Sequence, residues 1–362
     1  MMRRHFCTLA LLAAAAPLAA QDVANSAVIV DPQFVSYQLG SGSTARTVSQ
    51  LGMPLAWIVP FNDRFNMDVS TNFASSSVKT PGASTSSISG LTDAQIRGNL
   101  TLGDNAAVVT LGLNVPTGQY KVPTGEQVAA GQIGNDFLIY PVSSMGNGLA
   151  MTGGVAFAQT LGDWNLGLGA SYRYSSAFDA YEVQTTALRF KPGSEARLRV
   201  GLDRPVGDGA FNVSLTYSKF GNYTAADSSY GSGDRAMVQS SFSRPIGGNR
   251  DLLLSMWDLY RGVGQQIGGV PSPSENVGNL GVAVGFQLAN GVYLQPSVEE
   301  RSWIYDNANA GLMTNIGVRV RFDWMGLNMN PSVGYTLGSL YTTGLPSTDL
   351  SGFKVALLIR LH

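Results

Sequence analysis

The chain has 362 residues, and 13% of them are charged, about half of the roughly 25% usual for soluble domains. Its 23 basic and 24 acidic residues nearly balance, which excludes the basic excess typical of nucleic-acid-binding proteins. No run of about 18 apolar residues follows the first segment, so the sequence predicts no transmembrane helix. We therefore expect no nucleic-acid partner and no helical membrane anchor.

Residues 1–20 have the features of a secretory signal peptide. Arg3 and Arg4 form a basic start, and residues 6–16 are an apolar stretch too short to cross a bilayer. Two alanines at the end of the segment provide the small residues expected before a cleavage site. We expect this segment to be removed and residues 21–362 to form a single domain.

Loss of this segment would limit the chemistry of the mature chain. Cys7 is the only cysteine, so the remaining chain could form neither a disulfide nor a thiolate metal site. Two arginines would leave as well, so 21 basic residues would face 24 acidic ones and the net charge would become −3.

Short segments in which apolar and polar residues alternate follow one another along the rest of the chain. This alternation is the pattern of a β-strand with one apolar face and one polar face. We predict about sixteen strands, with fourteen or twelve as alternatives if weak strands lie outside the wall. In chain order the predicted strands are residues 33–39, 47–59, 65–73, 94–102, 106–115, 148–160, 164–174, 195–203, 211–219, 235–244, 251–261, 277–288, 292–303, 315–324, 327–337 and 353–361.

The clearest of these strands is residues 315–324. Its even-numbered positions are all apolar and include Val320, whereas its odd-numbered positions are glycine or polar and include two arginines. Met325 and Gly326 separate it from the equally regular residues 327–337, and a two-residue connection between alternating runs predicts a tight hairpin.

Two classes of connection alternate along the chain. Short turns rich in Gly, Asp and Asn alternate with longer polar loops, of which residues 75–89 and 116–147 are examples. Outer-membrane barrels have short periplasmic turns and longer outer loops. We therefore predict an all-β fold, a transmembrane antiparallel up-and-down β-barrel in the outer membrane of a Gram-negative bacterium, with its apolar face to lipid and both termini in the periplasm.

Two further features agree with a barrel. Aromatic residues gather near both kinds of connection, so we expect two aromatic girdles at the membrane–water interfaces. Those at short turns are Phe61, Phe65, Trp164, Phe211, Phe286, Tyr293 and Trp324, and those near long loops are Tyr37, Tyr120, Tyr140, Tyr172, Tyr174, Tyr217, Tyr260, Trp303, Tyr305 and Tyr341. The apolar alternation of the last strand resembles the terminal signal by which barrels are recognised for assembly, although the chain ends in histidine where phenylalanine is usual. The expected partners are outer-membrane lipid and, during biogenesis, the barrel assembly machinery.

The sequence offers little for catalysis. Its two histidines are His5, in the signal segment, and His362, the last residue, whereas hydrolases on barrels use histidine as a general base. No phosphate-binding loop and no cluster of metal-ligating residues is present in the sequence. We expect the protein not to be an enzyme and to use neither a cofactor nor a metal.

Arginine is the distinctive residue of the polar faces, since 18 of the 23 basic residues are Arg. One interpretation is that these residues line a lumen and select solutes by charge. The other, compatible with the first, is that they pair with carboxylates and amides and fill the barrel. The candidate lumen-lining residues are Arg97, Arg173, Arg197, Arg199, Glu299, Arg301, Arg319, Arg321, Asp323 and Asn330.

Two short motifs in the first third of the chain carry a family resemblance. Residues 90–93 (GLTD) precede a predicted strand, and residues 116–118 (PTG) follow one. With their surroundings they resemble the outer-membrane family named after the meta-pathway of phenol degradation, loosely akin to the fatty-acid transporter barrels. The resemblance implies a channel for small apolar or aromatic compounds. Nothing matches the N-terminal plug of the fatty-acid transporters.

From these observations we expect an outer-membrane channel for the passive uptake of small molecules, with apolar or aromatic solutes included. The alternative is a non-conducting barrel, filled by its own arginine and carboxylate network, that acts as a structural anchor or surface receptor. An outer-membrane hydrolase is disfavoured by the histidine count.

Overall fold

The computed structural model describes residues 26–361, with gaps at 104–105, 120, 184–185, 227, 267, 290 and 342–345. The expected signal peptide and both histidines lie outside the described residues. Within the described part of the chain, no helix is both long and apolar enough to cross a membrane.

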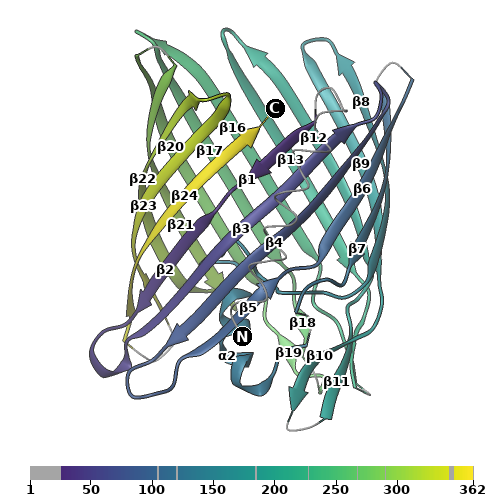
Figure 1. Cartoon of the computed structure of the whole chain (residues 1–362), viewed down its shortest axis with the longest axis vertical. Coiled ribbons are helices and arrows are strands. Elements are labelled where there is room, and N and C mark those ends of the chain that lie inside the picture. The colour runs from purple at the N-terminus through teal and green to yellow at the C-terminus, as the bar shows by residue number, and fades with distance from the viewer. Residues whose placement is uncertain are drawn as a thin grey trace.

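The strands form one closed, antiparallel barrel of 16 wall positions (Figure 1). Each predicted strand corresponds to one of these positions, so the predicted architecture is confirmed. The wall strands are β1 (Ala27–Val30), β2 (Gln33–Leu39), β3 (Arg46–Pro60), β4 (Phe65–Lys79), β5 (Ser86–Leu91), β6 (Ala94–Leu102), β7 (Ala107–Val115), β8 (Ala150–Leu161), β9 (Trp164–Ser175), β12 (Glu195–Val206), β13 (Gly209–Phe220), β16 (Arg235–Gly247), β17 (Arg250–Arg261), β20 (Glu275–Ala289), β21 (Val292–Tyr305), β22 (Ala308–Trp324), β23 (Leu327–Leu340) and β24 (Thr348–Leu361).

Two wall positions are each shared by two strands. β1 and β2 both lie between β24 and β3, and β5 and β6 both pair with β4. At the first break, the Asp31 amide donates to the Pro54 carbonyl and the Leu357 amide donates to the Pro32 carbonyl, which keeps the wall bonded where proline removes a donor. The barrel closes where β24 meets this composite strand.

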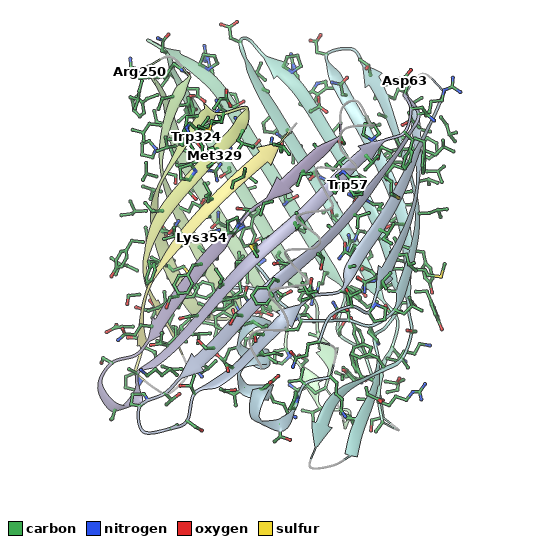
Figure 2. The ribbon with its side chains drawn as sticks, viewed as in Figure 1. Trp57, Asp63, Arg250, Trp324, Met329 and Lys354 are labelled. Atoms are coloured by element: carbon green, nitrogen blue, oxygen red, sulfur yellow. The ribbon has the colours of Figure 1, made fainter. Side chains whose placement is uncertain are left out.

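The two ends of the barrel differ. Short turns form one rim, which carries the labelled Asp63 and Arg250 (Figure 2), and the longer connections form the other (Figure 1). Ala27 pairs with Ile58 and Leu361 with Leu327, so the described wall begins and ends at the short-turn rim. The longer connections contain η1 (Gly42–Thr44), η2 (Thr124–Glu126), α2 (Gln127–Ile133), β10 (Phe178–Val183), β11 (Thr186–Lys191), β14 (Tyr223–Ala225), β15 (Ser228–Tyr230), β18 (Gly264–Gln265) and β19 (Pro271–Ser272).

The outer face of the wall is apolar and uncovered. Leu111 is 68% exposed, Met151 62% and Ile316 59%, although each lies inside a regular strand. A soluble protein would bury such side chains, whereas a barrel wall in a bilayer presents them to lipid. The inner face carries the alternate residues of the same strands, which are mostly polar.

Towards the long-loop rim, the outward face of the wall changes from apolar to polar and the inward face from polar to apolar, which we call the exchange of faces. On β4 the outward residues from Phe65 to Phe73 are apolar or threonine, but Ser75, Ser77 and Lys79 follow on the same face. On the inner face the order is reversed, because polar residues are followed by Val78, which is buried. The lipid-facing part of β4 is therefore residues 65–73, close to the 9–11 residues that a tilted strand needs to cross a bilayer.

Neighbouring strands show the same exchange. Val35, Val48, Ile88 and Leu350 point inwards near the long-loop rim and are buried, whereas Ser36 and Ser49, which are opposite each other in the register, face outwards. This finding corrects the assignment of residues 75–89 as a loop. The serine-rich stretch includes the end of β4 and the start of β5: Ser75 and Ser77 lie on the outward face, whereas Ser76, Val78 and Ile88 are buried inside the barrel.

The predicted outer aromatic girdle is partly wrong. Four of its members, Tyr172, Tyr174, Tyr217 and Tyr260, are exposed on the wall, but three others are not. Tyr37, Tyr140 and Trp303 all lie inside the barrel. The Tyr37 hydroxyl donates to the Leu138 carbonyl, and the Trp303 indole donates to Glu275. Tyr37 and Trp303 lie at the expected end of the wall, but nearness to a long loop could not show that they point inwards, and Tyr140 belongs to the loop itself.

Candidate functional site

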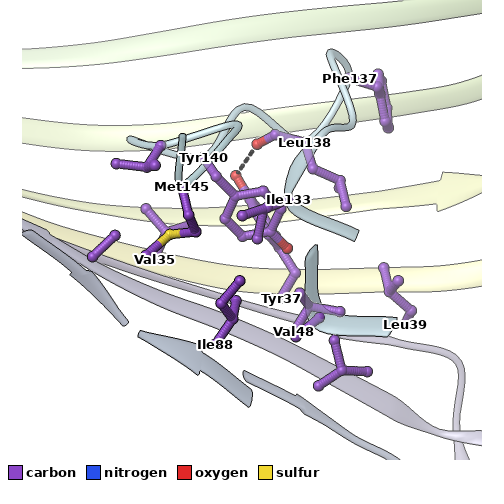
Figure 3. Packing of buried hydrophobic residues seen from close by; sticks show 14 of the residues in the cluster. Val35, Tyr37, Leu39, Val48, Ile88, Ile133, Phe137, Leu138, Tyr140 and Met145 are labelled. Atoms are coloured by element: carbon purple, nitrogen blue, oxygen red, sulfur yellow. Dashed lines mark hydrogen bonds between the residues drawn. The ribbon is translucent and has the colours of Figure 1, made fainter. Parts of the chain in front are cut away.

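The connection between β7 and β8, residues 116–149, folds back into the barrel and packs against its inner wall. Ile133, Phe137 and Leu138 are buried against the inward apolar residues of the wall (Figure 3). The Tyr140 ring is buried beside Tyr37, with ring centroids 5.7 Å apart. Burial raises the pKa of the Tyr140 phenol, so this side chain remains neutral. The main apolar core of the protein thus lies inside the barrel at the long-loop end.

Hydrogen bonds from wall side chains anchor this loop. The buried Gln50 amide donates to the Val142 carbonyl at 2.7 Å and accepts from the Val142 amide at 2.7 Å. Arg301 on β21, five wall positions away from Gln50 on β3, donates to the Phe137 carbonyl at 2.8 Å. Because two distant parts of the wall bind the loop backbone, the loop is a fixed part of the interior.

A buried carboxylate joins the two ends of the loop. Asp93 accepts hydrogen bonds from the Gly118 amide at 3.2 Å, from the Asn147 amide at 2.6 Å and from the Asn114 side chain at 2.9 Å. Nearby, the Thr117 hydroxyl donates to the Thr92 carbonyl. The two sequence motifs GLTD and PTG therefore meet in space, and together they form the base of the loop.

Gly118 has a steric reason to be glycine. A Cβ atom at this position would lie 2.3 Å from the Met145 carbonyl oxygen and 2.7 Å from the Asp93 amide nitrogen. Both are backbone atoms, so neither could move aside without opening the base of the loop.

The loop divides the interior of the barrel. On the side of β20–β24 it borders a cavity of about 230 Å³, which we call the basic cavity and which is lined by Glu299, Arg301, Arg319 and Lys354 among others. On the side of β3–β7 it borders a cavity of about 360 Å³, whose lining includes Asp93 and several amides. The two sides thus differ in charge.

Two of the four predicted lumen residues on the opposite wall form salt bridges. Arg97 donates to Asp68 at 2.9 Å, and Arg197 contacts Glu195 at 2.7 Å. The other members of this group lie close to them in the strand register: Arg173 is opposite Glu195, and Arg199 is opposite Thr216.

Near the short-turn rim, polar side chains also contact one another. The Arg321 guanidinium lies 4.6 Å from the centroid of the Tyr293 ring. Asn328 donates to Asp323 at 2.8 Å and accepts from Asn330 at 2.7 Å. Three of the predicted lumen residues, Glu299, Arg301 and Arg319, therefore line the basic cavity, and the others lie elsewhere on the wall.

Sequence reasoning missed several residues of the interior. Lys354 lies in the middle of the wall (Figure 2) and alternates with the apolar residues of the last strand, so its phase already assigned it to the inner face. Gln50 and Asp93 gave no such signal, because their partners lie in a loop distant in sequence. Among the described residues, no group of three His, Cys, Asp or Glu side chains is placed to hold a metal ion.

Comparisons with known proteins give likenesses of fold only. No protein-family model and no curated protein matches the chain. Similar solved structures include in-vitro-folded OmpT, an outer membrane protein of Vibrio cholerae, at 12% identity over 92% of this chain and 97% of that chain, with a TM-score of 0.44. A deltaS2S3 mutant of the TodX monoaromatic hydrocarbon channel is 9% identical over 95% of this chain and 92% of that chain, with a TM-score of 0.47. The outer membrane channel DcaP of Acinetobacter baumannii is 10% identical over 94% of this chain and 98% of that chain, with a TM-score of 0.45. At this similarity, no function is transferred from these proteins.

Replacing Asp93 tests the base of the loop. We expect Asp93→Ala to lower the free energy of unfolding by about 1–3 kcal/mol, because the Asn114 side chain and two backbone amides lose a buried acceptor. Limited proteolysis of the solubilised protein should then cut faster within residues 118–147. Asp63→Ala, in an exposed short turn, is the matched control. Equal behaviour of the two variants would contradict the proposed anchoring.

Proposed function

We propose that the protein is an outer-membrane channel through which small molecules, apolar or aromatic ones included, pass without an energy source. The observation that carries this proposal is a closed wall with apolar side chains outside and an inner space that holds two cavities beside a fixed loop. A barrel of this size encloses more volume than its own inward side chains fill, so a built-in constriction is the expected device for selectivity.

A second candidate function is a barrel that does not conduct and acts as an anchor or surface receptor. It is favoured by the anchoring of the loop, because side chains from two parts of the wall, Gln50 and Arg301, form hydrogen bonds with the loop backbone. A channel needs a passage past this loop, whereas an anchor or receptor does not.

Conductance separates the two candidates. We expect the purified protein to give stable current steps in a planar bilayer, and larger steps when residues 121–145 are replaced by a short Gly-Ser linker, because the linker removes the constriction. Shortening the exposed turn at 81–84 is the control and should change nothing. Current from the linker variant alone would favour the anchor or receptor, and no current from either protein would exclude the channel.

The proposed orientation places the long-loop rim outside the cell and both ends of the wall in the periplasm. It follows from the usual asymmetry of outer-membrane barrels, in which the short turns are periplasmic. Gly125 lies in the long connection, is exposed, and has open space where a Cβ atom would be added.

Cysteine labelling tests this orientation, because the chain without residues 1–20 has no cysteine of its own. We expect Gly125→Cys to react with a membrane-impermeant maleimide added to intact cells. Asp208→Cys, in the short turn between β12 and β13, should react only after the outer membrane is opened. The reverse pattern would overturn the orientation.

A further inference from the structure

The basic cavity has a charged half and an apolar half. Its wall strands contribute Glu299, Arg301, Arg319 and Lys354, whereas the loop contributes Leu138 and Ile139. The charged residues amount to three cations and one carboxylate, so the cavity has a formal excess of two positive charges.

Arg301 and Glu299 are neighbouring charges of opposite sign. They lie two residues apart on β21, on the same face, and therefore close together. The Arg301 donors are also occupied, at 2.8 Å by the Phe137 carbonyl and at 3.3 Å by Asn279, while its guanidinium lies 5.3 Å from the Trp257 ring centroid. This arginine is a structural part of the loop anchor, which leaves two cations without such a role.

These two cations are Arg319 and Lys354. Both side chains are accessible from the interior, and neither forms a hydrogen bond or salt bridge with any residue that the structure describes. They lie on β22 and β24, and the strand register separates their Cα atoms by about 12 Å across β23. Both long side chains can therefore reach one small ligand between them.

Two glycines line the cavity between these cations. Gly317 and Gly334 lie opposite each other on the inner face, and Gly334 is next to Lys354 in the register. A Cβ atom on Gly334 would lie 3.0 Å from the Asn315 side-chain oxygen, and one on Gly317 would lie 3.3 Å from the Ser297 hydroxyl. The polar atoms at this distance would also border a ligand bound over the glycines.

The apolar half is presented by a strained residue. Ile139 has a φ of 49°, a conformation that β-branched residues rarely adopt, and its side chain is still 44% exposed. Leu138 and the inward Met313 extend this apolar surface. Backbone strain that places an uncovered apolar side chain in a cavity is a feature of binding sites.

We propose that the basic cavity binds a small carboxylate with a short apolar body. Arg319 and Lys354 would hold the carboxylate, and Ile139, Leu138 and Met313 would contact the apolar part. Arginine matches the planar carboxylate with paired donors, and an unpaired lysine adds a second charge. The proposal deepens the proposed channel function by naming a solute class, but binding itself does not require conduction.

Calorimetric titration of the solubilised protein tests the site, with benzoate as the anionic probe and benzyl alcohol as a neutral molecule with the same ring. We expect benzoate to bind, to bind more tightly than benzyl alcohol, and to weaken as NaCl is raised, because salt screens the attraction. Arg319→Gln and Lys354→Gln should each weaken benzoate binding about tenfold or more, which is the effect of one lost charge-assisted hydrogen bond. Benzyl alcohol should be unaffected by either change.

Matched variants keep the result clear. Arg64→Gln removes the same charge from an exposed turn and should leave benzoate binding unchanged. Ile139→Gly suits the left-handed backbone and should weaken both ligands. A variant that fails to fold would lose its heat-modifiable migration on gels. If one of the two charge variants fails in this way, benzoate binding by the other charge variant tests the site.

Absent benzoate binding, or equal binding by wild type and both charge variants, would overturn the site. Failure of the site and failure of the channel function can be distinguished. Benzoate binding without current would support the site and contradict the channel function, whereas current without benzoate binding would support the channel function and contradict the site.

Discussion

The bilayer supplies no hydrogen-bond partners, so every backbone amide and carbonyl within it must be bonded inside the protein. The closed wall satisfies this requirement even where its strands are interrupted. At the first break the Asp31 amide bonds the Pro54 carbonyl, and at the second the Thr92 amide bonds the Asn72 carbonyl. Once the wall is closed, each side chain has only two possible surroundings, lipid outside or the barrel interior, and alternation along each strand decides between them.

The exchange of faces on β2–β5 and β24 ends the lipid-facing part of the wall. Beyond it the same strands act as the sheet of a soluble domain, with serine outside and valine or leucine inside. The loop between β7 and β8 supplies the second layer of that core, and Asp93 joins its two ends. The basic cavity lies where this core meets the polar interior, which explains its two unlike halves.

One strand at each of the 16 wall positions could be predicted because alternation is local and can be read from the strand's own residues. The short strands β1 and β5, which share two of these positions, could not. The packing of the barrel interior could not be predicted, because its contacts join residues that are distant in sequence. Tyr37 forms a hydrogen bond with Leu138, and Gln50 forms one with Val142, although about 100 residues separate the partners in each pair. No local sequence pattern indicates that such distant residues meet. The composition of residues 75–89 indicates a loop, whereas the alternation of their side chains fits the strands that they form. The phase of Lys354 on the last strand places it on the inner face.

The central claim is that the exchange of faces marks the end of the lipid-facing wall, and one strand can test it. Val69 and Ser77 both point outwards from β4, on the two sides of the exchange. The measurement is the free energy of unfolding in lipid vesicles after each is replaced by arginine. Val69→Arg should cost about 2–4 kcal/mol and Ser77→Arg about 0–1 kcal/mol, because charge is costly at the membrane centre and tolerated near the interface. Equal costs for the two variants would contradict the account.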